Sequence, residues 1–174
     1  MWLADMWLTG SGLADSWLTG SWLTGSRLEG HPVRFDTTEH HSGYAMSQVG
    51  IVLVSHSARL AEGAADLAGQ VSGGTVRVVP AGGTGDGGLG TSAEKIGQAL
   101  SAAESGGGVL ILPDLGSAVL TVLAMLEDLP GAHVLLADAP FVEGAVAATV
   151  TAAAGADLRA VAKAAEEAWH ARKL

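Results

Sequence analysis

The chain of 174 residues has no cysteine, which excludes disulfide bonds, zinc–thiolate sites and thiol nucleophiles. Aromatic residues are only 5% of the chain, and Phe141 and Trp169 are the only ones after residue 45. That region therefore offers little to stack against the ring of a flavin or an adenine, which argues against a flavodoxin-like binder.

Basic residues are also scarce: 9 Lys and Arg face 18 Asp and Glu, for a formal net charge of −9. This excess of negative charge argues against a surface for nucleic acid or for an anionic membrane. No apolar run approaches the roughly 20 residues of a membrane-spanning helix. We therefore expect a cytoplasmic protein that binds neither nucleic acid nor membrane.

The first 45 residues differ in kind from the rest. The unit at 17–21 (WLTGS) repeats at once at 22–26, and a related copy spans 6–11. Each unit contains glycine and none has a helix period, so we interpret residues 1–45 as a low-complexity Trp/Gly-rich extension, disordered or added by a start assigned upstream of Met46. A Trp-bearing docking tail is the alternative. Glu39–His41 is interpreted as solvated linker and not as a metal site.

Residues 46–174 are long enough for one domain with its own core. Short apolar stretches alternate there with helical patterns; the first helix is indicated by Leu60, Ala64, Leu67 and Val71, at spacings of four, three and four. Strands that are apolar throughout and each followed by a helix predict an α/β domain, with a mainly parallel sheet covered by helices on both faces. The predicted strands are 49–55, 75–79, 109–112 and 133–136, and the predicted helices include 58–72 and 118–128.

Polar or glycine-rich segments follow each predicted strand. In chain order they are Ser55–Ser57 around His56, the glycine-rich loop 80–90 with Thr91 and Ser92, Asp114 with Gly116 and Ser117, and Asp138. Because the carboxyl ends of parallel strands meet at one edge of the sheet, these groups are expected to line one mouth. Taken singly, each feature also fits a structural role, such as a helix cap at Asp114 or a surface loop at 80–90.

Several kinds of site fit this mouth poorly. The loops contain no Lys or Arg, and loop 80–90 lacks the Gly-Lys-Ser/Thr ending of a nucleotide P-loop. A Ser–His–Asp hydrolase is disfavoured because Ser55 and Ser57 adjoin His56 in the chain and no G-x-S-x-G elbow exists. A histidine nucleophile that accepts a phosphoryl group, held by hydroxyls and helix N–H groups, fits better.

Four segments then resemble, in the same order, the DhaM-type phosphotransferase subunit of phosphoenolpyruvate-dependent dihydroxyacetone kinase: Gly50–Ser57, Asp86–Ser92, Asp114–Ala118 and Asp138–Ala145. That subunit is similar to the enzyme IIA domain of mannose-type sugar phosphotransferase systems. The resemblance covers residues 46–174 and implies the fold of that domain.

By this resemblance, His56 is the phosphorylated residue and Asp114 the carboxylate beside it, and neither binds a metal. Thr91, Ser92, Gly116 and Ser117 are implied as phosphate-binding residues. The implied function is that of a phosphocarrier, a component of a kinase, which takes a phosphoryl group from phospho-HPr and passes it to ADP on a DhaL-type subunit.

The resemblance also implies that this chain binds no cofactor, since ADP or ATP and magnesium lie on the DhaL-type partner and dihydroxyacetone on a DhaK-type subunit. It further implies a homodimer, and the apolar segment 119–126 is a predicted interface. The alternative is a regulatory phosphohistidine module of a sugar phosphotransferase system that acts by protein binding.

Overall fold

The computed structural model describes residues 47–129 and 131–174. The predicted extension 1–45, including Glu39–His41, lies outside these residues. In chain order the elements are β1 (Gly50–Ser55), α1 (Ala58–Val71), β2 (Val78–Gly82), α2 (Ala93–Ala103), β3 (Val109–Pro113), α3 (Gly116–Glu127), β4 (Val134–Leu136), α4 (Phe141–Ala153), α5 (Leu158–Glu167) and the 3-10 turn η1 (Ala168–His170).

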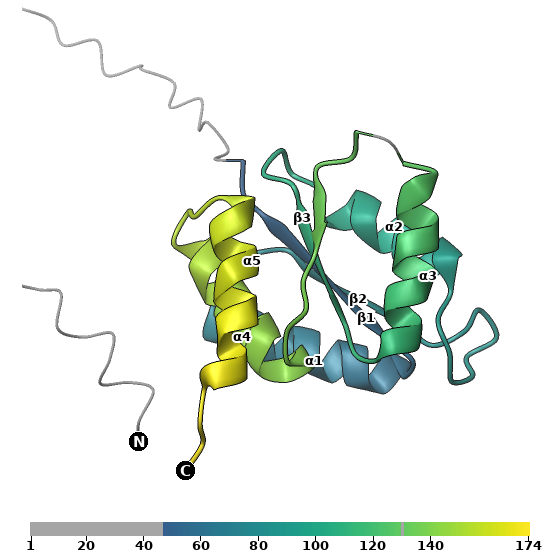
Figure 1. Ribbon diagram of the computed structural model, residues 1–174, viewed down its shortest axis with the longest axis horizontal. Helices are drawn as coiled ribbons and strands as arrows, with labels where there is room; N and C mark the ends of the chain where they lie inside the picture. The colour runs from purple at the N-terminus through teal and green to yellow at the C-terminus, as the bar shows by residue number, and fades with distance from the viewer. Residues whose placement is uncertain (1–46, 130) are drawn as a thin grey trace, which may run out of the picture. The chain divides into compact units, whose positions relative to one another are not determined.

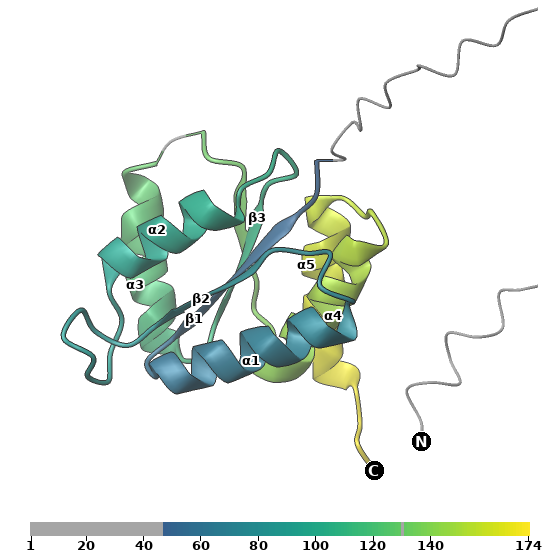
Figure 2. The same cartoon turned by 180° about the vertical axis from the view of Figure 1, so that it is seen from behind.

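The strands in the described residues form one parallel sheet in the order β2-β1-β3-β4. Figures 1 and 2 show α1, α4 and α5 over one face of this sheet and α2 and α3 over the other. The predicted α/β class, with helices on both faces of a parallel sheet, is confirmed. Among the helices of the described part, none has the length and apolar character needed to cross a membrane.

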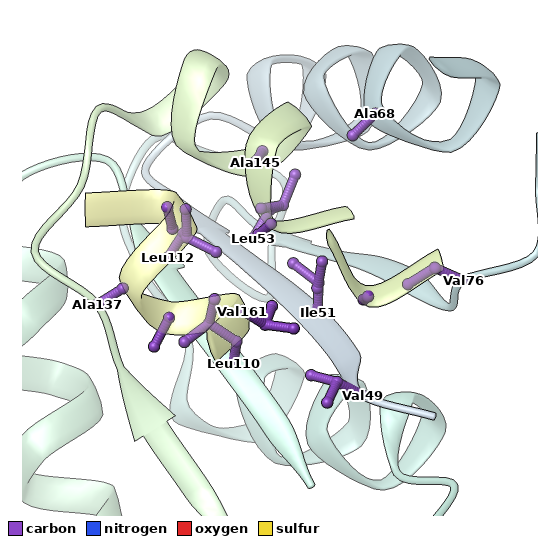
Figure 3. Packing of buried hydrophobic residues seen from close by; sticks show 14 of the residues in the cluster. Val49, Ile51, Leu53, Ala68, Val76, Leu110, Leu112, Ala137, Ala145 and Val161 are labelled. Atoms are coloured by element: carbon purple, nitrogen blue, oxygen red, sulfur yellow. The ribbon is translucent and has the colours of Figure 1, made fainter. Parts of the chain in front are cut away.

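Each face of the sheet has its own core. Ile51 and Leu53 point from β1 into the cluster beneath α1, α4 and α5, where they meet Leu110 and Leu112 of β3 (Figure 3). Val52 and Val54 point the other way, into the cluster under α2 and α3. All of β1 is buried, so it reads as a continuous apolar run and not as an alternating one.

The apolar pattern of α1 predicted the helix correctly but did not identify its buried face. The buried residues of α1 are all alanines (Ala61, Ala64, Ala65 and Ala68), whereas Leu60 and Leu67 remain 45% and 46% exposed. The alanine face and the leucine face are adjacent on the helix and both are apolar. Periodicity alone therefore did not decide which of them meets the sheet.

The second strand also lies elsewhere than predicted. It spans Val78–Gly82 and not 75–79, so Pro80 is part of the strand, paired with Leu53. Proline is tolerated because β2 is the edge of the sheet, where its missing N–H removes no essential ladder bond. The shift places Gly82 opposite Ser55, next to the predicted site.

Gly50 provides a test of the packing between β1 and α2. A methyl group at this position would overlap the carbonyl oxygen of Ala103 and lie 2.8 Å from its carbonyl carbon. We expect Gly50→Ala to lower the free energy of unfolding by about 1–3 kcal/mol, as overpacked cores do. Gly63→Ala is the matched control: nothing lies within 4 Å of its added methyl, so relief of the helix penalty should stabilise by about 0.5–1 kcal/mol. Urea unfolding measures both, and equal effects would contradict this packing.

Candidate functional site

His56 and Asp114 follow the two central strands, β1 and β3. From β1 the chain leads to β2 on one side, and from β3 it leads to β4 on the other. The carboxyl ends of β1 and β3 thus border the point where the connections diverge, which is where open α/β sheets bind ligands. The strand ladder continues up to the site, since Asp114 N–H donates to the carbonyl of Val54 at 2.9 Å.

The carboxylate of Asp114 contacts His56 in two places. Its Oδ1 lies 2.9 Å from ring Nδ1 of His56, and its Oδ2 accepts the backbone N–H of His56, also at 2.9 Å. The side chain of Asp114 is 9% exposed and that of His56 is 27% exposed. The two groups predicted to act together are therefore joined, with the imidazole more accessible than the carboxylate behind it.

The environment of Asp114 favours its ionised form. Burial by itself raises the pKa of this carboxyl, but the hydrogen bonds from the backbone and ring of His56 and from the hydroxyl of Ser55 together outweigh burial. The pKa of Asp114 consequently lies below its ordinary value. At neutral pH the group is a carboxylate and only accepts hydrogen bonds, so ring Nδ1 of His56 must carry the proton between them.

The other ring nitrogen, Nε2, then carries a lone pair in the neutral imidazole. Ser117 Oγ lies 2.8 Å from it and donates to it in this tautomer. Ser117 belongs to the first turn of α3, which begins at Gly116. The N–H groups of a helix's first turn have no partner within the helix. Nε2 thus contacts a hydroxyl from the first turn of α3, and the free N–H groups of such a turn are able to bind anionic oxygens.

The glycine-rich loop holds the backbone on the other side of His56. Gly82 approaches the start of α1 so closely that a methyl group there would lie 2.6 Å from the carbonyl oxygen of Ser57. Gly90 N–H donates to the carbonyl of His56 at 2.9 Å. Asp86 accepts hydrogen bonds from Thr84 Oγ1 and from Gly88 N–H. These bonds, chiefly the one from Thr84, lower the pKa of Asp86. The carboxylate of Asp86 therefore organises the loop itself.

The predicted phosphate-binding residues divide into two groups. Ser117 contacts ring Nε2 of His56 and Gly116 precedes it as the first residue of α3, and a role for either in phosphate binding stays a prediction. The hydroxyls of Thr91 and Ser92 have other partners: Thr91 pairs with Thr121 of α3 at 2.9 Å, and Ser92 accepts Lys95 N–H at 3.4 Å as the N-cap of α2. No hydrogen bond in the described residues joins either hydroxyl to His56, and a role for them in phosphate binding stays a prediction.

Two residues at the site have contacts that the sequence did not indicate: Lys95 was not expected there, and Ser55 was expected at this edge but without a role. Lys95 reaches back from α2 and donates from Nζ to the carbonyl of Gly82 at 3.1 Å, so a cation does lie near a mouth whose loops contain none. Ser55 is fully buried and bonded to Asp114 at 2.9 Å. Its place before His56 in the chain put Ser55 at the site. Because β1 is buried on both faces, the sequence did not indicate which way the Ser55 side chain points.

Asp138, also predicted at this edge, lies in the wall of a groove. The groove has a volume of about 510 Å³ and lies between the ends of β3 and β4, with Asp114 and Asp138 among its lining residues. Trp169 forms another part of its wall and donates to the carbonyl of Asp138 at 3.0 Å. Within residues 47–129 and 131–174, no group of three or more His, Asp or Glu is arranged to hold a metal ion.

Comparisons with known proteins identify the family of this chain. Residues 50–162 match the family described as PTS system fructose IIA component. The solved structure of EF1359, a protein of unknown function, superposes with a TM-score of 0.63 and shares 35% sequence identity. The match covers 69% of this chain and 94% of the EF1359 chain.

Curated relatives carry the name PEP-dependent dihydroxyacetone kinase, phosphoryl donor subunit DhaM. Those of Pantoea ananatis and Escherichia coli are 43% and 41% identical over 65% and 63% of this chain, but the match spans only 25% of their length. A Listeria innocua protein named as the same subunit of kinase 2 is 39% identical over 59% of this chain and 84% of its own length. These matches confirm the resemblance to DhaM-type subunits, and the chain belongs to the mannose-type enzyme IIA family of phosphotransferase system components.

Proposed function

We propose that this chain is a phosphocarrier and a component of a kinase: it accepts a phosphoryl group from phospho-HPr on Nε2 of His56 and passes it on for the phosphorylation of dihydroxyacetone. The observation that carries the proposal is the alignment of Asp114, His56 and Ser117 along the two nitrogens of one imidazole. The names of the DhaM relatives support the same role.

In the proposed transfer, the lone pair of Nε2 attacks the phosphorus of the donor phosphohistidine. The donor's P–N bond breaks and its electron pair returns to the donor ring. As the new P–N bond forms, the ring of His56 gains positive charge, which the carboxylate of Asp114 stabilises through Nδ1–H. The hydroxyl of Ser117 turns from Nε2 to a phosphoryl oxygen. The first N–H groups of α3 donate to the phosphoryl oxygens in place of solvent. Positioning and charge stabilisation therefore supply most of the rate.

We further propose that the acceptor is ADP bound with magnesium on a DhaL-type subunit, with dihydroxyacetone held on a DhaK-type subunit. This chain carries no P-loop sequence for a nucleotide of its own. We also propose a homodimer that forms in the cytoplasm through α3. Leu120 and Leu123 of that helix are 68% and 47% exposed, an apolar surface that a second copy would cover.

The choice of acceptor gives a direct test. His56 is labelled from phospho-HPr, and single-turnover loss of label is followed with free ADP and magnesium, with the DhaL-type subunit alone, and with both. We expect rapid loss only with both, because the partner supplies the nucleotide site. We also expect the rate to depend on ionic strength, because this acidic chain must approach the charged surface of its partner.

Two other outcomes of the acceptor test would contradict the proposed transfer. Rapid transfer to free ADP would show that this chain binds the nucleotide itself. Retention of the label with both components present, under conditions where phospho-HPr still loads His56, would favour the regulatory module that acts by protein binding.

A further inference from the structure

Ser55 is one of only two buried polar residues in the described part of the chain; the other is Thr149. It is the last residue of β1 and stands directly before His56. Its Oγ lies 2.9 Å from Oδ2 of Asp114, and it accepts the backbone N–H of Ser57 at 3.0 Å. Ser55 therefore connects the end of β1, the start of α1 and the carboxylate that follows β3.

The direction of these bonds follows from the donors available. A hydroxyl has a single proton, and Ser57 N–H occupies a lone pair of Ser55 Oγ without using that proton. The proton is thus free for Asp114, which as a carboxylate can only accept. Asp114 consequently accepts three bonds: Ser55 Oγ–H and His56 N–H on Oδ2, and the ring Nδ1–H on Oδ1.

We propose that Ser55 is a positioning residue which holds the Asp114 carboxylate in the rotation that presents Oδ1 to Nδ1 of His56. Through this contact it fixes the ring in the tautomer with its proton on Nδ1. The consequence for phosphoryl transfer rests on the proposed function, because only this tautomer has a lone pair on Nε2. Ser55 touches neither the phosphoryl group nor the reacting nitrogen in this arrangement.

Loss of the hydroxyl should loosen this arrangement without abolishing it. In Ser55→Ala the backbone N–H of His56 still holds Oδ2, so Asp114 keeps part of its alignment. The remaining freedom allows the ring to populate the tautomer with its proton on Nε2, which cannot attack phosphorus. We expect the single-turnover rate of phosphorylation by phospho-HPr to fall about tenfold, the size of effect of one lost hydrogen bond to a charged group.

The test measures the ring tautomer of His56 separately from the rate of phosphoryl transfer. Ring ¹⁵N chemical shifts of His56 are recorded in the unphosphorylated protein, at a pH where the ring is neutral, for the wild type, Ser55→Ala and Ser55→Thr. We expect predominantly Nδ1–H in the wild type, a measurable fraction of Nε2–H in Ser55→Ala, and recovery in Ser55→Thr, which keeps a hydroxyl. Should Ser55→Ala fail to fold by circular dichroism, Ser55→Cys replaces it, since a thiol is only a weak donor.

Thr149→Val is the matched control. It removes the other buried hydroxyl, which donates to the carbonyl of Ala145 within α4, and should change stability but neither the tautomer nor the rate. A Ser55→Ala protein with wild-type ring shifts would overturn the inference, as would a rate within a factor of two of the wild type. Failure of the wild type to accept phosphate would instead refute the proposed function and leave the tautomer result standing.

Discussion

We expect His56→Gln to abolish phosphorylation by phospho-HPr and to leave the fold intact. Glutamine has no nucleophilic nitrogen, so no P–N bond can form at this position. The backbone N–H of residue 56 and the hydroxyl of Ser55 still donate to Oδ2 of Asp114, which keeps the carboxylate partnered. The side chain of His56 lies at the edge of the sheet and is 27% exposed, so the substitution leaves no core cavity.

The measurement is incorporation of label from phospho-HPr, with thermal unfolding as a check of the fold. The bond formed in the wild type is expected to be labile to acid and stable to base, as a phosphoramidate is. His170→Gln is the matched control, because His170 lies in η1 near the end of the chain and should accept no label. An acid-stable phosphoserine at Ser55 or Ser57 would refute His56 as the nucleophile.

Asp114→Ala should slow phosphoryl transfer by roughly 10²–10⁴, the range for a positioned acid–base partner. The variant loses both the proton acceptor that sets the ring tautomer and the negative charge that stabilises the ring during transfer. Stability should fall by about 1–3 kcal/mol, because the substitution leaves the hydroxyl of Ser55 and the N–H of His56 without their acceptor. This cost does not come from a lost helix cap: α3 is capped by Leu115, without a side-chain bond.

Stopped-flow mixing with phospho-HPr measures the rate, and urea unfolding measures the stability. Asp157→Asn serves as the control, since asparagine caps α5 as well as aspartate does and the position is remote in the chain from the site. An Asp114→Ala rate within a factor of three of the wild type would exclude the assigned role.

The shared position of His56 and Asp114 at one edge of the sheet could be predicted from the sequence pattern, whereas their direct contact was implied by the family resemblance. Apolar runs identified β1 and β3, and parallel strands bring the residues after them to one edge. The position of β2 could not be predicted in the same way. Pro80 argues against a strand unless the strand is known to be at the edge, and edge position is a property of the whole sheet.

The individual hydroxyls were harder to place than the two principal residues. The helix predicted at 118–128 begins two residues earlier, at Gly116, and this start places Ser117 in its first turn against Nε2. Thr91 and Ser92 follow the glycine-rich loop, and the path of that loop depends on long-range contacts such as Gly90 with His56. The sequence gives the order of such hydroxyl groups along the chain, but it does not predict where their side chains point.

The pairing of β1 with β3 has a consequence for the site's motions. Val54 pairs with Pro113, and the N–H of Asp114 extends that ladder to the residue beside the imidazole. Separating the backbone of Asp114 from that of His56 would require breaking the middle of the sheet, with two buried clusters attached to it. These two backbone segments therefore separate only when the whole core unfolds, whereas the glycine loop and the start of α3 can open locally. An acceptor protein would therefore meet a nitrogen whose orientation is already set, and only the groups around the phosphoryl oxygens need to adjust to it.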